Sequence, residues 1–372
     1  MGAKWNGLKK LAYRDMANTK ERTSVERTIV YYRKDKEQEC KEKLLFIDPL
    51  KVLIPRSVNN RDRPIKLPKY IAFCLDDENR LLLYIQEQPA INTEGETIKI
   101  NATCCNMQTD DAAFEGWAVC LRAWFPEKIK TVSLRWDIPA VESQNPHYRR
   151  FLFRVRRFAE LYDWFTVDAT NLGEVENFIK SFNKLTINSS NIDPKQKSNL
   201  ENHTEYDFVK KPALAERFKS YYGIDNFDHQ LHMGIKKEHL QYFPGGQSAI
   251  DLWGRSENSI TVIELKCGNN KVGIISELFL YVCVVIDLAK GNIETPSACK
   301  LEHERLLFTN IKSTTVFHAE MLADEYHPLL ENRAVLDILN NNLSGKEGVQ
   351  LMFGKTTFAY NSETQKLVLS CE

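Results

Sequence analysis

Two apolar segments that carry Asp251, Glu264 and Lys266 constrain this chain more than any other feature. Residues 249–255 read Ala-Ile-Asp-Leu-Trp-Gly-Arg, and residues 259–266 read Ser-Ile-Thr-Val-Ile-Glu-Leu-Lys after a short polar turn. Apolar runs on both sides of such a turn predict a β-hairpin. With the turn centred on Glu257 and Asn258, Asp251 lies opposite Glu264, their Cβ atoms about 5 Å apart. Strand alternation places Lys266 on the same face.

The apolar surroundings of these charges indicate what they do. Both faces of the two strands are otherwise apolar, so we expect the sheet to be covered on both sides. Burying Asp251, Glu264 and Lys266 is then costly unless another charge offsets the carboxylates. Two carboxylates with waters and a phosphate oxygen make a Mg²⁺ site. Such a cation activates a bound water and polarises the phosphate, while a lysine orients or deprotonates that water and screens the developing charge.

This arrangement resembles the active site of the PD-(D/E)XK nuclease superfamily. Ile250-Asp251-Leu252 matches the first acidic strand, and Val262-Ile263-Glu264-Leu265-Lys266 matches the strand that ends in acid-x-Lys. The likeness extends over about residues 212–321, in the order helix, three strands, helix, strand. It implies Asp251, Glu264 and Lys266 as the catalytic residues, with Asp251, Glu264 and the Leu265 carbonyl holding Mg²⁺, for which Mn²⁺ substitutes.

Three further residues extend the resemblance. Glu216 lies on the predicted helix before the core strands, where many members carry an acid that reaches the metal; a solvated helix face is the alternative. Glu277 and Tyr281 lie where many members carry a Gln and a Tyr four residues apart, although Glu277 replaces the usual Gln. The two share one helical face. A helix N-terminal acid and a buried aromatic would explain them equally simply.

Three other interpretations remain open, two for the charged residues and one for nearby histidines. The hairpin could carry a surface salt bridge, or the fold could have lost catalysis. His229, His232 and His239 could form a zinc site, but no Cys pair completes one nearby.

The domain organisation follows from length and composition. A chain of 372 residues exceeds what one core usually organises. Residues 186–203 are nearly all polar and predict a linker. We therefore expect an α+β domain of unknown role over 1–185, a linker over 186–203, and an α/β restriction-endonuclease-like domain over 204–372, with a mixed central sheet flanked by helices.

In the first domain the pattern predicts strands at 28–32, 44–54, 70–75, 81–86, 97–102 and 131–136, and helices at 110–125, 148–165 and 172–185. In the second it predicts helices at 212–222, 272–289 and 329–339, and strands at 229–235, 248–253, 260–266, 313–321, 350–353, 357–360 and 367–371.

The charge distribution suggests how a polyanion could be held. The whole chain has no net charge, with 50 basic and 50 acidic residues, but the basic excess lies before residue 200 and the acidic excess after it. Arginines with interleaved aromatics on the helix at 148–165 suit phosphate contact and base stacking; a helix whose aromatics simply pack inward is the alternative. The candidate nucleic-acid contacts are Arg149, Arg150, Arg154, Arg157, Lys236, Lys237 and Lys271.

The remaining features favour an enzyme of the cytoplasm. The nine cysteines form no Cys-x-x-Cys pair, and the N-terminus has no export signal. No apolar run reaches the length that spans a bilayer, so we expect no membrane contact. The resemblance implies a Mg²⁺-dependent endonuclease in a prokaryotic defence, restriction or mobile-element context, with DNA favoured over RNA and homodimerisation left open. The alternative is a catalytically inactive nuclease-fold subunit that binds nucleic acid or a partner protein.

Overall fold

The computed structural model describes residues 67–371 except 69, 77, 92–96, 108, 141–144, 189–199, 245–247, 269–270, 296–310, 312–315, 342 and 344–347. Over these residues the chain is a mixed α/β protein with mixed sheets, in agreement with the fold class at that level. The strands predicted at 28–32 and 44–54 lie outside the described residues.

The first half of the chain contains a four-stranded sheet of order β1-β2-β5-β6. The β1–β2 pair is antiparallel, and the other two pairs are parallel. Aromatic packing joins this sheet to its helices, since the Phe114 ring contacts those of Phe151, Phe158 and Phe165. The elements are β1 (Ile71–Leu75), β2 (Arg80–Ile85), β3 (Glu87–Ile91), β4 (Thr97–Asn101), η1 (Ala102–Cys104), α4 (Phe114–Trp124), β5 (Thr131–Trp136), α5 (Pro146–Leu161), β6 (Phe165–Val167) and α6 (Leu172–Ser181).

A six-stranded sheet forms the centre of the second half. Its order is β16-β15-β14-β12-β11-β8, with β12, β14 and β15 parallel and the outer pairings antiparallel. The second-half elements are α7 (Leu200–Lys210), α8 (Pro212–Tyr222), β8 (Asn226–His232), β9 (Gly234–Lys237), β10 (Leu240–Phe243), β11 (Ala249–Arg255), β12 (Ser259–Lys266), α9 (Gly273–Ala289), β13 (Ile293–Glu294), β14 (Val316–Ala323), η2 (Pro328–Glu331), α11 (Ala334–Asn340), β15 (Gln350–Asn361) and β16 (Lys366–Cys371).

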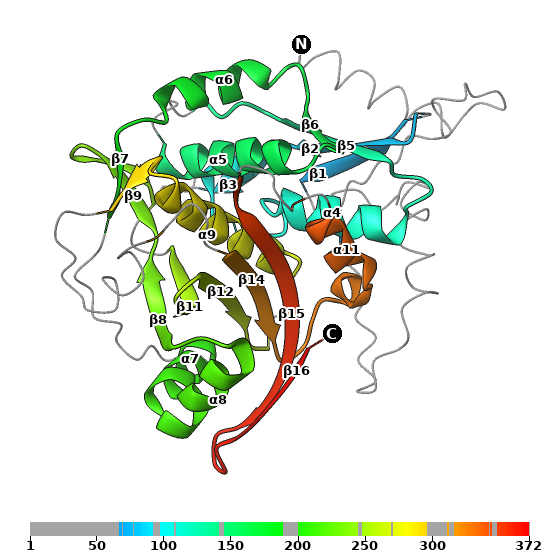
Figure 1. Ribbon diagram of the computed structural model, residues 1–372. Helices are drawn as coiled ribbons and strands as arrows, with labels where there is room; N and C mark the ends of the chain where they lie inside the picture. The colour runs from blue at the N-terminus through cyan, green and yellow to red at the C-terminus, as the bar shows by residue number, and fades with distance from the viewer. Residues whose placement is uncertain are drawn as a thin grey trace.

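Helices cover both faces of this sheet, as expected from its apolar residues. Figure 1 shows α9 on one side of the strands and α7 with α8 on the other. Leu252 and Ile263 pack with Phe208 and Phe218 beneath α7 and α8, whereas their strand neighbours belong to the core cluster that includes α9. Among the described helices, none is both long enough and apolar enough to cross a membrane.

Local signals explain where two of the helices begin and end. Asn145 caps α5 by accepting hydrogen bonds from the amides of His147 and Tyr148, and Pro146 occupies the first turn. Helix α8 also starts with a proline, and it ends at Gly223, whose φ of 65° lies in the left-handed region that glycine adopts most easily. The predicted helix at 212–222 is therefore confirmed at both ends.

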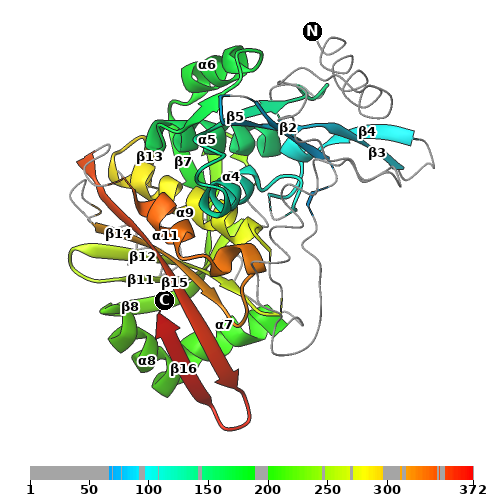
Figure 2. The ribbon, with the colours of Figure 1, turned by 90° about the vertical axis from the view of Figure 1, so that its right-hand side faces the viewer.

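The predicted division into two domains joined by a linker at 186–203 needs correction. Residues 186–188 belong to β7 (Leu185–Asn188), which pairs with β9 and β13 from the second half. Residues 200–203 form the first turn of α7, and 189–199 lie outside the described residues. One hydrophobic cluster includes residues of both halves, and Figure 2 shows α4 and α5 close to α9. The two halves thus share a core.

Candidate metal centre

The hairpin of β11 and β12 has the predicted register. Leu252 pairs with Ile263 and Trp253 with Val262, so Asp251 lies across from Glu264. The backbone N–H of Leu265 donates a hydrogen bond of 2.9 Å to Asp251 Oδ2, which fixes that carboxylate against the neighbouring strand. The Leu265 side chain points to the opposite face, toward α7 and α8.

Lys266 is surrounded by carboxylates. Its Nζ lies 2.5 Å from Glu264 Oε1 and 3.1 Å from Glu277 Oε2. It also lies 3.9 Å from Glu201 Oε1 and 4.0 Å from Asp251 Oδ2. The three residues singled out in the hairpin, and Glu277 of α9, therefore converge at one end of the sheet.

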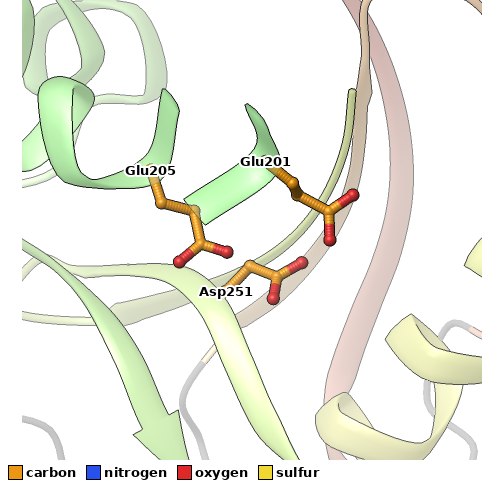
Figure 3. A group of neighbouring side chains, drawn as sticks. All are labelled: Glu201, Glu205 and Asp251. Atoms are coloured by element: carbon orange, nitrogen blue, oxygen red, sulfur yellow. The ribbon is translucent and has the colours of Figure 1, made fainter. Parts of the chain in front are cut away.

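Two acids that sequence reasoning missed complete the group. Glu201 and Glu205 lie on successive turns of α7, and each offers a carboxylate oxygen within 4.8 Å of the other's and of one from Asp251 (Figure 3). At a ligand distance of about 2.1 Å, oxygen ligands of one Mg²⁺ are about 3 Å apart when adjacent and about 4.2 Å apart when opposite. The three side chains would thus close toward one another to share a cation. The four-residue spacing of the two acids was the available signal.

Glu216, the acid predicted to approach the metal, does something else. Its side chain is 71% exposed and pairs with Lys219 at 2.9 Å. It belongs to the solvated face of α8, and the helical acids at the site come from α7 and α9 instead. That prediction was wrong.

Burial dominates the electrostatics of the cluster. It raises the pKa of Glu205 to about 9 and that of Glu201 to about 7, with the negative charge of Asp251 adding to both shifts. The pKa of Glu264 also rises well above its ordinary range, first through burial and then through Asp251 and Glu277. Burial lowers the pKa of Lys266, but the surrounding carboxylates outweigh this and raise it well above its ordinary value. Lys266 therefore stays protonated. Its single positive charge cannot neutralise all of the carboxylates around it.

This imbalance is what a divalent cation would correct. Four carboxyl groups lie within 4.0 Å of Lys266 Nζ, those of Asp251, Glu201, Glu264 and Glu277, and that of Glu205 lies beside Asp251 and Glu201. Within the described part of the chain, Oε2 of Glu264 is buried and accepts no hydrogen bond. Buried carboxylates without such partners are costly and are commonly neutralised by protons or by metals. All-oxygen donors of this kind favour hard cations such as Mg²⁺, Mn²⁺ or Ca²⁺.

Tyr281 borders the same site on α9. The side chain is 2% exposed, and burial raises the pKa of its phenol well above the ordinary value, with Glu264, Glu277 and Asp251 adding to the effect. Glu277 contacts the lysine directly, so the structure brings both residues of the predicted α9 pair to the site.

The arginines of α5 do not form the predicted nucleic-acid surface. Arg154 is 2% exposed and makes a two-pronged ion pair with the buried Glu115. Arg157 is also buried and pairs with Glu160. Arg150 is buried too, and its Nη1 donates to Ser248 Oγ at 2.7 Å. Arg154 thus bonds to α4, Arg150 to Ser248 before β11, and Arg157 within α5. A role in contacting phosphates is not consistent with these buried positions.

The other predicted basic contacts are less buried. Arg149 lies over the Tyr242 ring at 4.7 Å, and Lys237 Nζ donates to the Ser181 carbonyl and to Asn183 Oδ1. Lys236 is half-buried, and Lys271 is exposed. These four residues remain available for contact with a polyanion to differing degrees.

The histidines do not gather into a metal site among the described residues. His229 Nδ1 lies 2.9 Å from Asp228 Oδ1, His232 is buried in β8, and His239 is exposed in the turn before β10. The one grouping of possible ligands found in the described ranges consists of Glu201, Glu205 and Asp251.

Comparison with known proteins adds no relative. The chain matches no protein family model, no curated protein and no solved structure. Its function is therefore argued from the geometry of the site.

Proposed function

We propose that this chain is a metal-dependent nuclease of the PD-(D/E)XK kind that hydrolyses phosphodiester bonds with Mg²⁺. The observation that carries the proposal is the convergence of Lys266 Nζ with Glu264 Oε1 at 2.5 Å and Asp251 Oδ2 at 4.0 Å on one hairpin. Apart from β9, β10 and β13, which belong to another sheet, the chain order is α8, β8, β11, β12, α9, β14. This order supports a restriction-endonuclease-like fold, because it repeats the order expected for that family.

The proposed metal ligands are Asp251 and Glu264, as the resemblance implies, together with Glu201 and Glu205 from α7. Their donors are all carboxylate oxygens, which suits Mg²⁺ and accepts Mn²⁺ as a substitute. When bound, the cation would supply an activated water and polarise the phosphate. Asp251 belongs to the hairpin, and its carboxylate faces Glu201 and Glu205 of α7 (Figure 3), so it is the central ligand of the proposal.

Lys266 supplies a positive charge to the proposed reaction in addition to the metal. Its raised pKa keeps the ammonium protonated, so it suits charge stabilisation and water orientation better than proton abstraction. A fixed positive charge in a site with little water stabilises negative charge that develops on a phosphate. Glu277, 3.1 Å from Nζ, holds the ammonium in position.

The substrate is proposed as nucleic acid, with DNA favoured over RNA. The burial of Arg150, Arg154 and Arg157 leaves four residues as the phosphate contacts of the proposal: Arg149, Lys236, Lys237 and Lys271. Homodimerisation and a defence, restriction or mobile-element role stay expectations from the resemblance.

Cleavage assays with matched variants test the proposal. Plasmid DNA, single-stranded DNA and RNA are incubated with Mg²⁺, Mn²⁺ or EDTA and the wild-type protein, and Glu264→Gln and Lys266→Met are compared with it. Glu216→Gln is the control, because that carboxylate is exposed and paired with Lys219. We expect metal-dependent cleavage by the wild type and the control and none by the other two, with folding checked by circular dichroism. Equal cleavage by all four proteins would refute the assignment.

An inactive nuclease-fold subunit is the second candidate. Lys266 and Glu264 are 5% and 1% exposed, and their direct ion pair could serve shape alone. This alternative predicts that the wild type binds nucleic acid equally with EDTA or Mg²⁺ and cleaves none of the three substrates.

A further inference from the structure

Gln230 of β8 occupies an unusual position beside the acidic cluster. Its neighbours Leu231 and His229 pair with Ile250 and Leu252 of β11, so Gln230 lies across from Asp251. Its side-chain Nε2 donates a hydrogen bond of 2.6 Å to Glu205 Oε2. Gln230 thus lies beside Asp251 on the neighbouring strand and donates a hydrogen bond to Glu205 on α7.

The backbone of Gln230 is strained. Its φ is 51°, in the left-handed region that a residue with a side chain adopts at a cost, and glycine would adopt it freely. Such a conformation inside a strand persists when surrounding contacts hold it, and it is more frequent at functional sites than elsewhere. Glutamine has no local preference for this conformation. The strain occurs together with the hydrogen bond from the Gln230 side chain to Glu205.

We propose that Gln230 is a positioning residue that orients the Glu205 carboxylate toward a metal ion shared with Glu201 and Asp251. This inference rests on the proposed metal site. A neutral amide suits the task, because it fixes one carboxylate oxygen without adding a positive charge that would compete with the cation. Groups that hold a ligand in this way commonly change metal affinity by 10- to 100-fold when they are removed.

Two substitutions separate positioning from a merely structural role. Gln230→Gly removes the amide and relieves the backbone strain, whereas Gln230→Ala removes the amide and keeps the strain. We expect both to weaken Mn²⁺ binding by about 10- to 100-fold in calorimetric titration. We also expect the glycine variant to melt at a temperature equal to or above that of the wild type in EDTA, and above that of the alanine variant.

The chain supplies a matched control in Gln365. This glutamine has a φ of 53° in the exposed turn between β15 and β16, the hairpin that projects from the rest of the fold in Figure 1. Gln365→Gly relieves the same strain and should leave Mn²⁺ affinity unchanged. A general effect of a new glycine on the fold would appear in both Gln230→Gly and Gln365→Gly.

The outcomes distinguish this inference from the proposed function. If the wild type binds Mn²⁺, Glu205→Gln weakens binding, and both Gln230 variants bind like the wild type, then Gln230 does not position the ligand. If the wild type binds no Mn²⁺ by titration and shows no Mn²⁺-induced rise in melting temperature, the metal site itself is refuted and this inference with it. Weakened binding by both Gln230 variants with an unchanged Gln365→Gly supports it.

Discussion

Without a metal, the stability of this protein should fall as the pH rises. Burial raises the pKa of Glu205 to about 9 and that of Glu201 to about 7, from ordinary values of 4.5. A carboxyl group with a raised pKa in the folded state binds its proton more tightly there than in the unfolded chain. Its contribution to stability is fully present below the unfolded pKa and is lost as the pH rises through the folded pKa.

The size of the effect follows from proton counting. One proton held by the folded state and not by the unfolded chain changes the free energy of unfolding by about 1.36 kcal/mol per pH unit. Between about pH 5.5 and 7.5 the Glu205 carboxyl alone would lower it by about 2.7 kcal/mol. Glu201 adds to this over the part of the interval below its own pKa. Metal binding displaces these protons, so it should reverse the trend.

Urea unfolding at several pH values measures the effect. The wild type is compared with Glu205→Gln, first in EDTA and then with Mn²⁺. We expect the free energy of unfolding in EDTA to fall more steeply with pH for the wild type than for the variant, and Mn²⁺ to stabilise the wild type most at the highest pH. A stability in EDTA that is flat or rising with pH, or equal slopes for both proteins, would contradict the account.

Three other predictions concern the shared core. Glu115→Ala should lower the free energy of unfolding by about 3–5 kcal/mol in urea titration, because it leaves Arg154 buried without its carboxylate; a loss below about 1 kcal/mol would show that water reaches the arginine. Gly116→Ala should cost about 1–3 kcal/mol, since its Cβ would lie 2.4 Å from the Val272 carbonyl oxygen where α4 meets α9; a melting temperature equal to that of the wild type would argue against this close packing. A chain that begins at residue 199 should fail to fold, because it lacks the first half of the common core; a cooperative melting transition from that fragment would restore the two-domain interpretation.

The sequence predicted the hairpin well because strand geometry is local. An alternation of two residues determines which side chains share a face, and a short turn determines the register. These two rules are sufficient to bring Asp251, Glu264 and Lys266 together. The bounds of α8 were equally predictable, since Pro212 and Gly223 act on their own backbones.

The acids of α7 could not be predicted in the same way. The helix has few large apolar residues and follows a polar stretch, so its first turn was assigned to a linker. Glu201 and Glu205 gain their role from the approach of α7 to the end of β12, where the Cys267 amide lies 3.4 Å from Glu201 Oε2. That contact spans 66 residues and depends on the tertiary fold.

The burial of the α5 arginines could not be predicted from the local sequence either. An arginine among aromatic residues has the same local sequence whether it faces solvent or pairs inside the core. The partner of Arg154 is Glu115, which lies 39 residues earlier on another helix. Only the packing of α4 against α5 shows that the charge is already neutralised and cannot serve a phosphate.

The most direct test of the central claim is the anomalous scattering of Mn²⁺ in crystals of the wild-type protein. This measurement needs no knowledge of the substrate. We expect a Mn²⁺ peak bounded by carboxylate oxygens of the proposed ligands Asp251, Glu264, Glu201 and Glu205, with ligand distances of about 2.1–2.2 Å, and the loss of that peak in Asp251→Asn. A well-ordered cluster without a Mn²⁺ peak at saturating metal, with Lys266 still paired to Glu264, would contradict it.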